Sequence, residues 1–348
     1  MTGRPAITLR AVIAEIPAEC YERSTRKSLL YLVRASLIYA TIVAALLAAD
    51  QPLLLLLLWP LAGLAISGLF VLGHDAAHGA LFENPRWNDL AGRIALLPSL
   101  HAYSVWILGH NRIHHVHAGR QGYDFVWHPL TPEQYGALDQ RHRWLHRLEW
   151  SAAGVGLYYL LEVWWKRMVR LQPLPRFAAD FRRDRLVVTL YAAAASLLWL
   201  AAGWVIYGSI GGALWTWIKV GLMPWLCWNY AIGITVYLQH ICAESGWHGD
   251  EDWSRYRGQI ETTTNYVAPA WYNLFAHNIF LHIPHHVDPR IPFYNLPQAN
   301  EALQRRFGDD FTTRPLTFLG YLQTTRRCKL YDFASGRWSG YPEQSETS

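Results

Sequence analysis

The sequence predicts an all-α integral membrane protein, with four membrane-spanning helices in two hairpins, interfacial helices and a cytoplasmic helical cap that carries clustered histidines. The composition is the first observation, because 52% of the 348 residues are apolar and only 16% are charged, against roughly 25% charged in a typical soluble protein. The second is four apolar stretches that reach the about 20 residues needed to cross a bilayer. The third is the clustering of many of the sixteen histidines outside those stretches.

The apolar stretches are grouped in pairs. A short turn separates the two members of each pair, at residues 50–52 and at the glycine-rich segment 208–212. Each pair is therefore predicted to form a tight transmembrane hairpin. A buried helical hairpin of a large soluble protein is the alternative, but the stretches are too long and too poor in charge for it. The predicted spans are residues 31–49, 53–72, 186–207 and 213–238.

Basic residues predict how the chain is oriented in the membrane. Neither hairpin turn contains Lys or Arg, whereas the loop between the hairpins is rich in arginine. Because positive charge is retained in the cytoplasm, this loop and both termini are predicted to be cytoplasmic. Within the loop, residues 90–108 and 151–165 are apolar but flanked by polar groups, so we expect interfacial or re-entrant helices there. The net charge of +5 fits basic loops at a lipid surface better than nucleic-acid binding.

Three histidine clusters lie on the predicted cytoplasmic side. Residues four apart share one face of an α-helix, so His74 with His78, and His110 with His114, can each chelate one ion. Eight imidazoles exceed what one tetrahedral ion can use, so two ions are expected. Imidazole suits Zn, Cu, Fe and Ni alike, and spacing alone does not separate di-iron from di-zinc. The clusters are His74 and His78; His110, His114 and His115; and His282, His285 and His286.

The clusters resemble the three histidine boxes of the membrane fatty acid desaturases. The sequences HDAAHGALF, W-x3-HNRIHH and HIPHHVDPRIPFYNLPQA are most similar to the Δ12/ω-3 acyl-lipid type. Outside the boxes, TLRAVIAEIPAECYERSTRKSLLYLVR, YDFVWHPLTPEQY and IPFYNLPQANEAL resemble further segments of that subfamily. The resemblance runs from about residue 8 to about residue 305. It implies a cytoplasmic or interfacial segment 1–30, a desaturase domain 31–305 and a cytoplasmic tail 306–348.

The same resemblance implies a histidine-ligated di-iron centre. Its ligands, carried over box by box, include a histidine just after the last span, which His240 matches. His277 is a weaker candidate. Pro284 inside the third box and three residues between the first two histidines of the second box are departures from close relatives. The implied ligands are His74, His78, His110, His114, His115, His240, His282, His285 and His286.

Other polar residues near the boxes are given different roles. Asp75, Asp124 and Asp288 are candidates to accept the free N–H of a ligating imidazole, and solvated or helix-capping carboxylates are the alternative. His142 and His146 have helical spacing but are expected in a solvated basic segment. The histidines not expected to bind metal are His101, His117, His128, His142, His146 and His248.

The resemblance implies an O2-dependent enzyme that introduces a cis double bond into a fatty acyl chain carried by a lipid, CoA or carrier protein. Because there is no GxGxxG and no fused HPGG haem motif, we expect an external ferredoxin or cytochrome donor that docks on Arg141, Arg143 and Arg147. A hydroxylase, acetylenase or ketolase acting on a lipid or carotenoid uses the same site. A membrane zinc hydrolase or metal-binding transporter is the alternative from another class.

Overall fold

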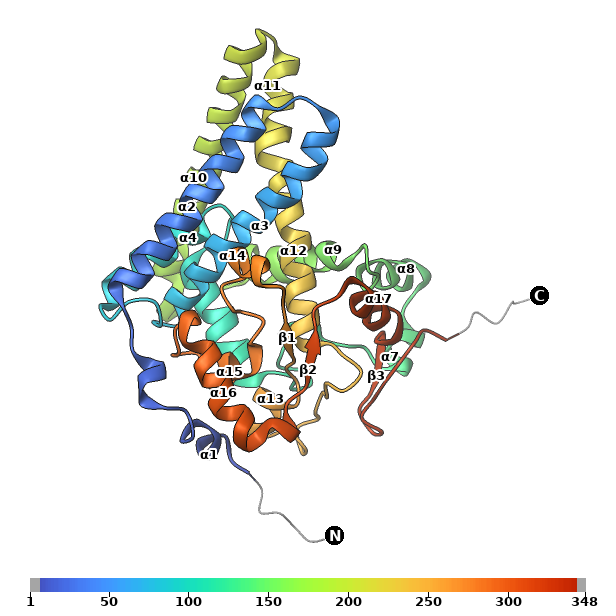
Figure 1. Cartoon of the computed structure of the whole chain (residues 1–348). Helices are drawn as coiled ribbons and strands as arrows, with labels where there is room; N and C mark the ends of the chain where they lie inside the picture. The colour runs from blue at the N-terminus through green and yellow to red at the C-terminus, as the bar shows by residue number, and fades with distance from the viewer. Residues whose placement is uncertain (1–6, 343–348) are drawn as a thin grey trace, which may run out of the picture.

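The structure of the protein, a computed structural model, describes residues 7–342. It has an elongated upper part of long helices and a broader lower part of short helices and loops (Figure 1). Three helices are long and apolar enough to cross a membrane: Thr25–Ala48, Pro52–Ala77 and Pro175–Tyr207. They correspond to α2 Thr25–Ala48, α3 Pro52–Ala77 and α10 Ala178–Tyr207, the last preceded by η4 Pro175–Phe177.

Local sequence explains where these helices begin and end. Ser24 caps the start of α2, because its side chain accepts a hydrogen bond from the Lys27 backbone N–H. Pro52 opens α3 at the first helical position, where its missing N–H costs nothing. Gly208 ends α10 with a left-handed φ of 63°, a conformation that favours glycine. The first predicted hairpin is therefore formed by α2 and α3, with the turn at residues 49–51.

The fourth predicted span, 213–238, lies in a helical path that changes pitch. The path runs through α11 Ile210–Thr216, the π-helical η5 Trp217–Leu222 and α12 Met223–His240. Lys219, inside η5, is fully buried. Its Nζ donates to the Ala49 carbonyl at 2.9 Å and to Asp50 Oδ1 at 2.9 Å, so the second hairpin is tied to the turn of the first. This path is not among the three spans given above, and the four-span arrangement stays a prediction.

The segment between α3 and α10 forms a layer of short helices at the base of the long ones. The predicted interfacial stretches correspond here to α4 with α5, and to α9 with the π-helical η3, although their bounds differ. The elements are α4 Pro85–Leu96, α5 Tyr103–Trp106, the π-helical η2 Ile107–His114, α6 His115–His117, α7 Pro132–Ala137, α8 Gln140–Glu149, α9 Val155–Tyr158 and η3 Tyr159–Val169.

The lower part also contains the segment before α2 and the segment after α12, as far as residues 7–342 describe them. Its helices are α1 Leu9–Ile13, η1 Ala18–Tyr21, α13 Arg255–Ile260, η6 Ala270–Tyr272, α14 Asn273–Ala276, α15 His282–Val287, η7 Phe293–Asn295, α16 Leu296–Phe307, η8 Gly308–Asp310 and α17 Phe318–Arg327.

Two small sheets depart from the all-α expectation, although the described chain is mostly helical. β1 Asn265–Val267 pairs in parallel with β2 Thr313–Pro315, with Asn265 opposite Thr313. β3 Leu330–Asp332 pairs antiparallel with β4 Arg337–Ser339. Each strand has three residues, too few for an alternating hydrophobic pattern to be recognised in the sequence.

The segment predicted as a C-terminal tail packs against the rest of the protein. Cys328 and Leu330 are fully buried, and Lys329 Nζ donates to the carbonyl of Trp150. Trp150 belongs to an aromatic cluster with Trp127 and Tyr237, whose rings meet edge to face. Residues 313–332 therefore help to hold α8, α9 and α12 together beneath the long helices.

Candidate metal centre

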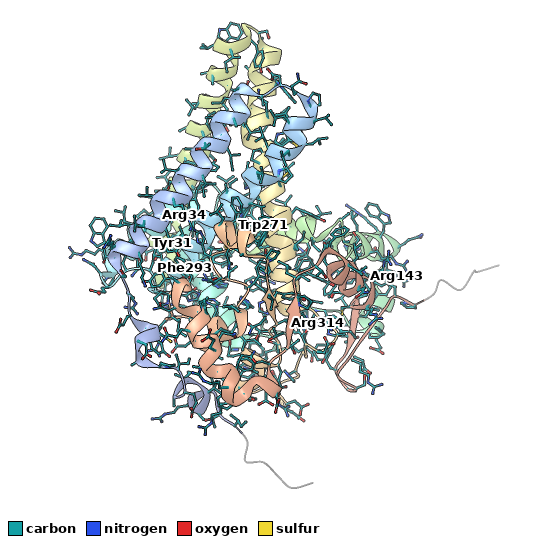
Figure 2. The ribbon with its side chains drawn as sticks, in the orientation of Figure 1. Tyr31, Arg34, Arg143, Trp271, Phe293 and Arg314 are labelled. Atoms are coloured by element: carbon teal, nitrogen blue, oxygen red, sulfur yellow. The ribbon has the colours of Figure 1, made fainter. Side chains whose placement is uncertain are left out.

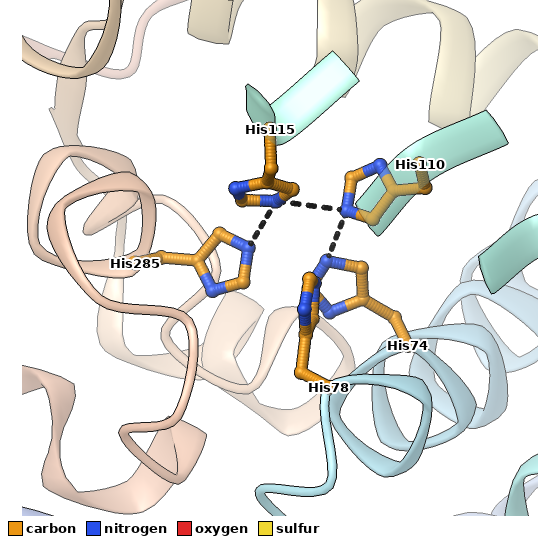
Figure 3. A group of neighbouring side chains, drawn as sticks. All are labelled: His74, His78, His110, His115 and His285. Atoms are coloured by element: carbon orange, nitrogen blue, oxygen red, sulfur yellow. Dashed lines mark hydrogen bonds between the residues drawn. The ribbon is translucent and has the colours of Figure 1, made fainter. Parts of the chain in front are cut away.

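Five histidines from three distant segments converge on one point. Figure 3 shows their rings turned toward one another, from the end of α3, from η2 with α6, and from α15. The Nε2 atoms of His74 and His110 lie 2.8 Å apart, those of His110 and His115 3.1 Å apart, and those of His115 and His285 3.2 Å apart. The fifth ring, His78, lies 4.7 Å from those of His74 and His115. One nitrogen from each of the five lies within 4.8 Å of the others.

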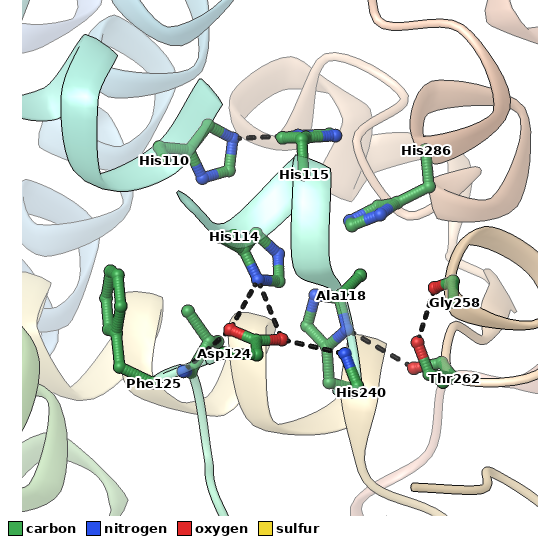
Figure 4. Close-up of polar contacts among 12 residues, drawn as sticks. His110, His114, His115, Ala118, Asp124, Phe125, His240, Gly258, Thr262 and His286 are labelled. Carbon is green, nitrogen blue, oxygen red and sulfur yellow. Dashed lines mark hydrogen bonds and ion pairs between the residues drawn. The ribbon is translucent and has the colours of Figure 1, made fainter. Parts of the chain in front are cut away.

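A second group lies directly beside the first. His114, His240 and His286 also bring one nitrogen each within 4.8 Å of the others, and all three are buried. The Nε2 atoms of His282 and His240 are 3.1 Å apart. The His115 and His286 rings stack across the two groups at 4.3 Å (Figure 4). All nine strong candidates from the sequence are therefore brought together.

The prediction paired His110 with His114 at one ion, but the structure places these two histidines in different groups. The second box lies in the π-helical η2, where backbone hydrogen bonds join residues five apart. His110 and His115 therefore share a face and join the first group, whereas His114 joins the second. The sequence gives no direct signal for this wider turn. The pairing of His74 with His78 on α3 agrees with the α-helical spacing.

The outer ring nitrogens are held by neighbouring polar groups. His74 Nδ1 lies 3.2 Å from Asp75 Oδ1, and His114 Nδ1 lies 3.0 Å from Asp124 Oδ1. Asp124 also accepts the backbone N–H groups of Gly119 and Val126, at 2.9 and 3.0 Å. These contacts turn the Nε2 atoms of both histidines inward, as partners of metal-bound imidazoles do.

The sequence analysis missed Gln259 as a partner of the clustered histidines, and it proposed Asp288 for a role that its contacts in the structure do not match. Buried Gln259 on α13 lies 2.9 Å through its Oε1 from His286 Nδ1, and its Nε2 donates to the His115 carbonyl at 2.7 Å. It lies far from every box in sequence, so only the fold reveals it. Asp288 instead accepts hydrogen bonds from the Tyr21 hydroxyl and the Arg290 guanidinium, and not from a clustered histidine.

The arrangement fits metal binding on its own chemistry. Imidazole nitrogens about 2.1 Å from a shared ion lie roughly 2.9–3.4 Å apart, and the Nε2 separations of 2.8, 3.1 and 3.2 Å in the first group are close to this range. Burial, followed by the charges of neighbouring histidines, holds the pKa of His285 and His286 well below the usual range. The rings are therefore neutral, which is the form that binds metal. These clusters could hold metal ions through nitrogen donors alone.

The remaining histidines lie outside both groups. His277, the weaker candidate, points its Nδ1 at Arg34 at 3.3 Å and packs on Tyr31 and Phe293; Figure 2 labels those three neighbours near α2. His142 is exposed as expected. His146 is not, because its ring is buried against Trp150 at 5.3 Å and its Nδ1 lies 2.8 Å from the Tyr341 hydroxyl. The expectation that His146 is solvated is therefore wrong, since the C-terminal segment covers it.

An apolar pocket opens onto the histidines. His74, His110, His114, His240 and His282 form part of its lining. The rest is mostly apolar and comes from four helices (α3, α5, η3 and α12), from residues 125–126 and from the turn after α14. The apolar lining includes Phe70, Val71, Trp106, Val126, Tyr159, Val163, Met168, Ile232, Val236 and Ile279. A long alkyl group in this cavity would lie against the histidine clusters with water excluded.

Comparison with known proteins agrees with the fold and the histidine clusters. A family model described as fatty acid desaturase matches residues 51–316, more than half of the chain. The chain therefore belongs to the fatty acid desaturase family, a family of di-iron membrane oxidoreductases.

Curated relatives give the subfamily. The chain is 30% identical over 341 residues to the sn-1 oleoyl-lipid 12-desaturase of Synechocystis sp., covering 94% of this chain and 90% of the relative. It is 28% identical to the enzyme of the same description from Anabaena variabilis, over 94% and 91%. It is 27% identical to the chloroplastic omega-6 fatty acid desaturase of Spinacia oleracea, over 98% and 74%. The resemblance to the Δ12/ω-3 acyl-lipid type is confirmed, and the chain is a fatty acyl desaturase.

Proposed function

We propose that this desaturase holds two iron ions and uses O2 to introduce a cis double bond into a fatty acyl chain of a membrane lipid. The observation that carries the proposal is the convergence of nine histidines beside an apolar pocket that five of them line; eight form the two adjoining groups, and His282 lies against His240. We assign the first ion to His74, His78, His110, His115 and His285, and the second to His114, His240 and His286 with His282 beside them. His277 is left out of this set.

The metal supplies the oxidising power for an unactivated C–H bond, which no side chain can break. The chain's own residues do the rest. Phe70, Trp106 and Ile279 line the cavity and are suited to fixing an alkyl chain against the histidines. Asp75, Asp124 and Gln259 hold the outer imidazole nitrogens and so fix the ring orientations.

The acyl carrier and the electron donor are inferred from relatives. Two relatives are named as desaturases of oleoyl lipid, and one from Nostoc sp. is named sn-1 acyl-lipid omega-3 desaturase (ferredoxin). We therefore propose a glycerolipid substrate and a small external donor of the ferredoxin type. We propose that the donor docks on the basic residues of α8, among them Arg143, which Figure 2 labels in the lower part of the protein. We also propose four spans, with the clusters and both termini in the cytoplasm, because the hairpin turns lack Lys and Arg.

Expression in a host whose lipids contain only monounsaturated chains tests the proposal. We expect new diunsaturated acyl chains in extracted lipid, and iron near two per chain in the purified protein. A hydroxylated product would instead support the rival outcome at the same site. Zinc in place of iron, with no change in the lipids, would refute the oxygenase assignment.

A further inference from the structure

A second, polar cleft adjoins the apolar cavity. It lies between α8, η3 and the segment 122–130. Phe125 lines both spaces, and η3 turns Val163 and Met168 into the cavity but Glu162 and Lys166 into the cleft. Figure 4 shows Phe125 beside Asp124 and His114, close to the metal cluster. An acyl chain that leaves the cavity past Phe125 would bring its polar end into this cleft.

The inner wall of the cleft carries buried polar atoms that lack partners within the described chain. Glu149, the last residue of α8, is 6% exposed, and its Oε1 has no hydrogen-bond partner among residues 7–342. The same holds for Nε2 of His146 and Nδ1 of His128, which also line the cleft. A buried polar atom without a partner costs about 1–3 kcal/mol. A ligand that supplies hydrogen bonds at this wall would recover that free energy.

The charged residues that line the cleft indicate which kind of ligand it can bind. Asp124, Glu149 and Glu162 contribute three carboxyl groups, against two cations, Lys166 and Arg167. Lys166 is held by both oxygens of Glu162 at 2.6 and 2.7 Å, and Arg167 lies over the Phe125 ring at 5.2 Å. The lining therefore has no excess of positive charge to bind a phosphate. The acceptors on the inner wall instead suit hydroxyl donors, and Trp150 and Tyr158 provide flat apolar faces beside them.

We propose that this cleft binds the uncharged, hydroxyl-bearing headgroup of the acyl lipid, with Glu149 and His146 as its hydrogen-bonding partners. The proposal rests on the desaturase function and names the polar part of its substrate. Because the headgroup and the histidine clusters are fixed relative to each other, the distance from Phe125 to the metal centre sets which carbons of the chain reach it. Glu149 and His146 are therefore specificity residues for the substrate's polar end.

The test compares Glu149→Leu with Glu149→Gln, which keeps the shape and the hydrogen-bonding atoms of a neutral carboxyl group. The probes are diacylglycerol carrying one hexose and phosphatidylglycerol with identical acyl chains, presented in mixed micelles with a chemically reduced ferredoxin. For the hexose lipid, we expect Glu149→Leu to raise KM about tenfold, the equivalent of one to two lost hydrogen bonds, with kcat within twofold. Glu149→Gln should restore most of the affinity.

Glu133→Leu, an exposed glutamate on α7 outside the cleft, is the matched control and should leave both constants unchanged. Equilibrium binding of the hexose lipid without reductant, where no turnover occurs, separates this proposal from the desaturase function. Binding that weakens in Glu149→Leu supports the cleft even if no double bond forms. Equal KM values in wild type and Glu149→Leu, or a wild-type preference for phosphatidylglycerol or for acyl chains on CoA or a carrier protein, would overturn it.

Discussion

Replacement of Asp124 by Asn tests whether the groups around the histidines control metal binding. The Asp124 carboxylate accepts three donors: His114 Nδ1 at 3.0 Å, Gly119 N at 2.9 Å and Val126 N at 3.0 Å. Gly119 meets Oδ2 and Val126 meets Oδ1. Whichever way the Asn amide faces, its NH2 therefore opposes a backbone N–H or the His114 N–H, and one buried donor loses its acceptor.

The expected loss follows from that geometry. An unpaired buried donor costs about 1–3 kcal/mol, and removal of such a partner of a metal-bound histidine costs about 10–100-fold in metal affinity. A tenfold change is about 1.4 kcal/mol, so the two figures agree. We expect Asp124→Asn to lose iron at a free iron concentration about 10–100 times higher than wild type does. Elemental analysis after dialysis against graded metal buffers measures this.

Asp288→Asn is the control, because Asp288 is equally buried but accepts from Tyr21 and Arg290 instead of a clustered histidine. It should lower thermal stability without moving the metal-loss curve. If Asp124→Asn and Asp288→Asn retain iron alike, the proposed role of Asp124 is wrong.

Further predictions concern the metal, the long helices and the cleft. His115→Ala should lower iron below one per chain, because the ring touches both groups, whereas His78→Ala should remove only the first ion; elemental analysis separates them. Replacing exposed His142 by Ala should change neither iron content nor melting temperature, whereas His146→Ala should lower the melting temperature and leave the iron content unchanged. Lys219→Met leaves the Ala49 carbonyl unpaired, so it should destabilise by about 1–3 kcal/mol with iron content unchanged, measured by thermal unfolding in detergent. Burial, then the charge of Glu162, raises the pKa of Glu149 to about 7. The contribution of Glu149 to stability is therefore complete below its unfolded-state pKa and is lost as pH rises through 7. Glu149→Gln should melt higher than wild type at pH 8 but not at pH 4, and equal melting temperatures at pH 8 would contradict this.

The lengths of the apolar stretches and the spacing of the histidines were sufficient to predict part of this structure. The stretches 31–49, 53–72 and 186–207 correspond to α2, α3 and α10, with only residue 49 outside its helix, because long uncharged runs have few other stable conformations in a membrane. The structure of the fourth stretch, 213–238, was harder to predict from the sequence. Its buried Lys219 is stabilised by contacts with Asp50 and Ala49, which lie nearly 170 residues away in the chain. The role of Gln259 was also not predictable from the sequence, because its contacts with His286 and His115 form only when α13 packs against α6. The wider pitch of η2 also lacks a sequence signature, and so the partner of His110 was predicted incorrectly.

The doubled histidines of the second and third boxes let each of two helices contribute to both histidine groups. Consecutive residues on a helix point about 100° apart, so one side chain of such a pair can face each group. His114 and His115 divide in this way, as do His286 and His285. The first group is completed by His74 and His78 at the end of α3, and the second by His240 at the end of α12. Each group thus joins one long helix to η2 and α15, and the π-helical pitch of η2 brings His110 to the same side as His115. A regular α-helix there would align His110 with His114 instead and would leave the first group without His110.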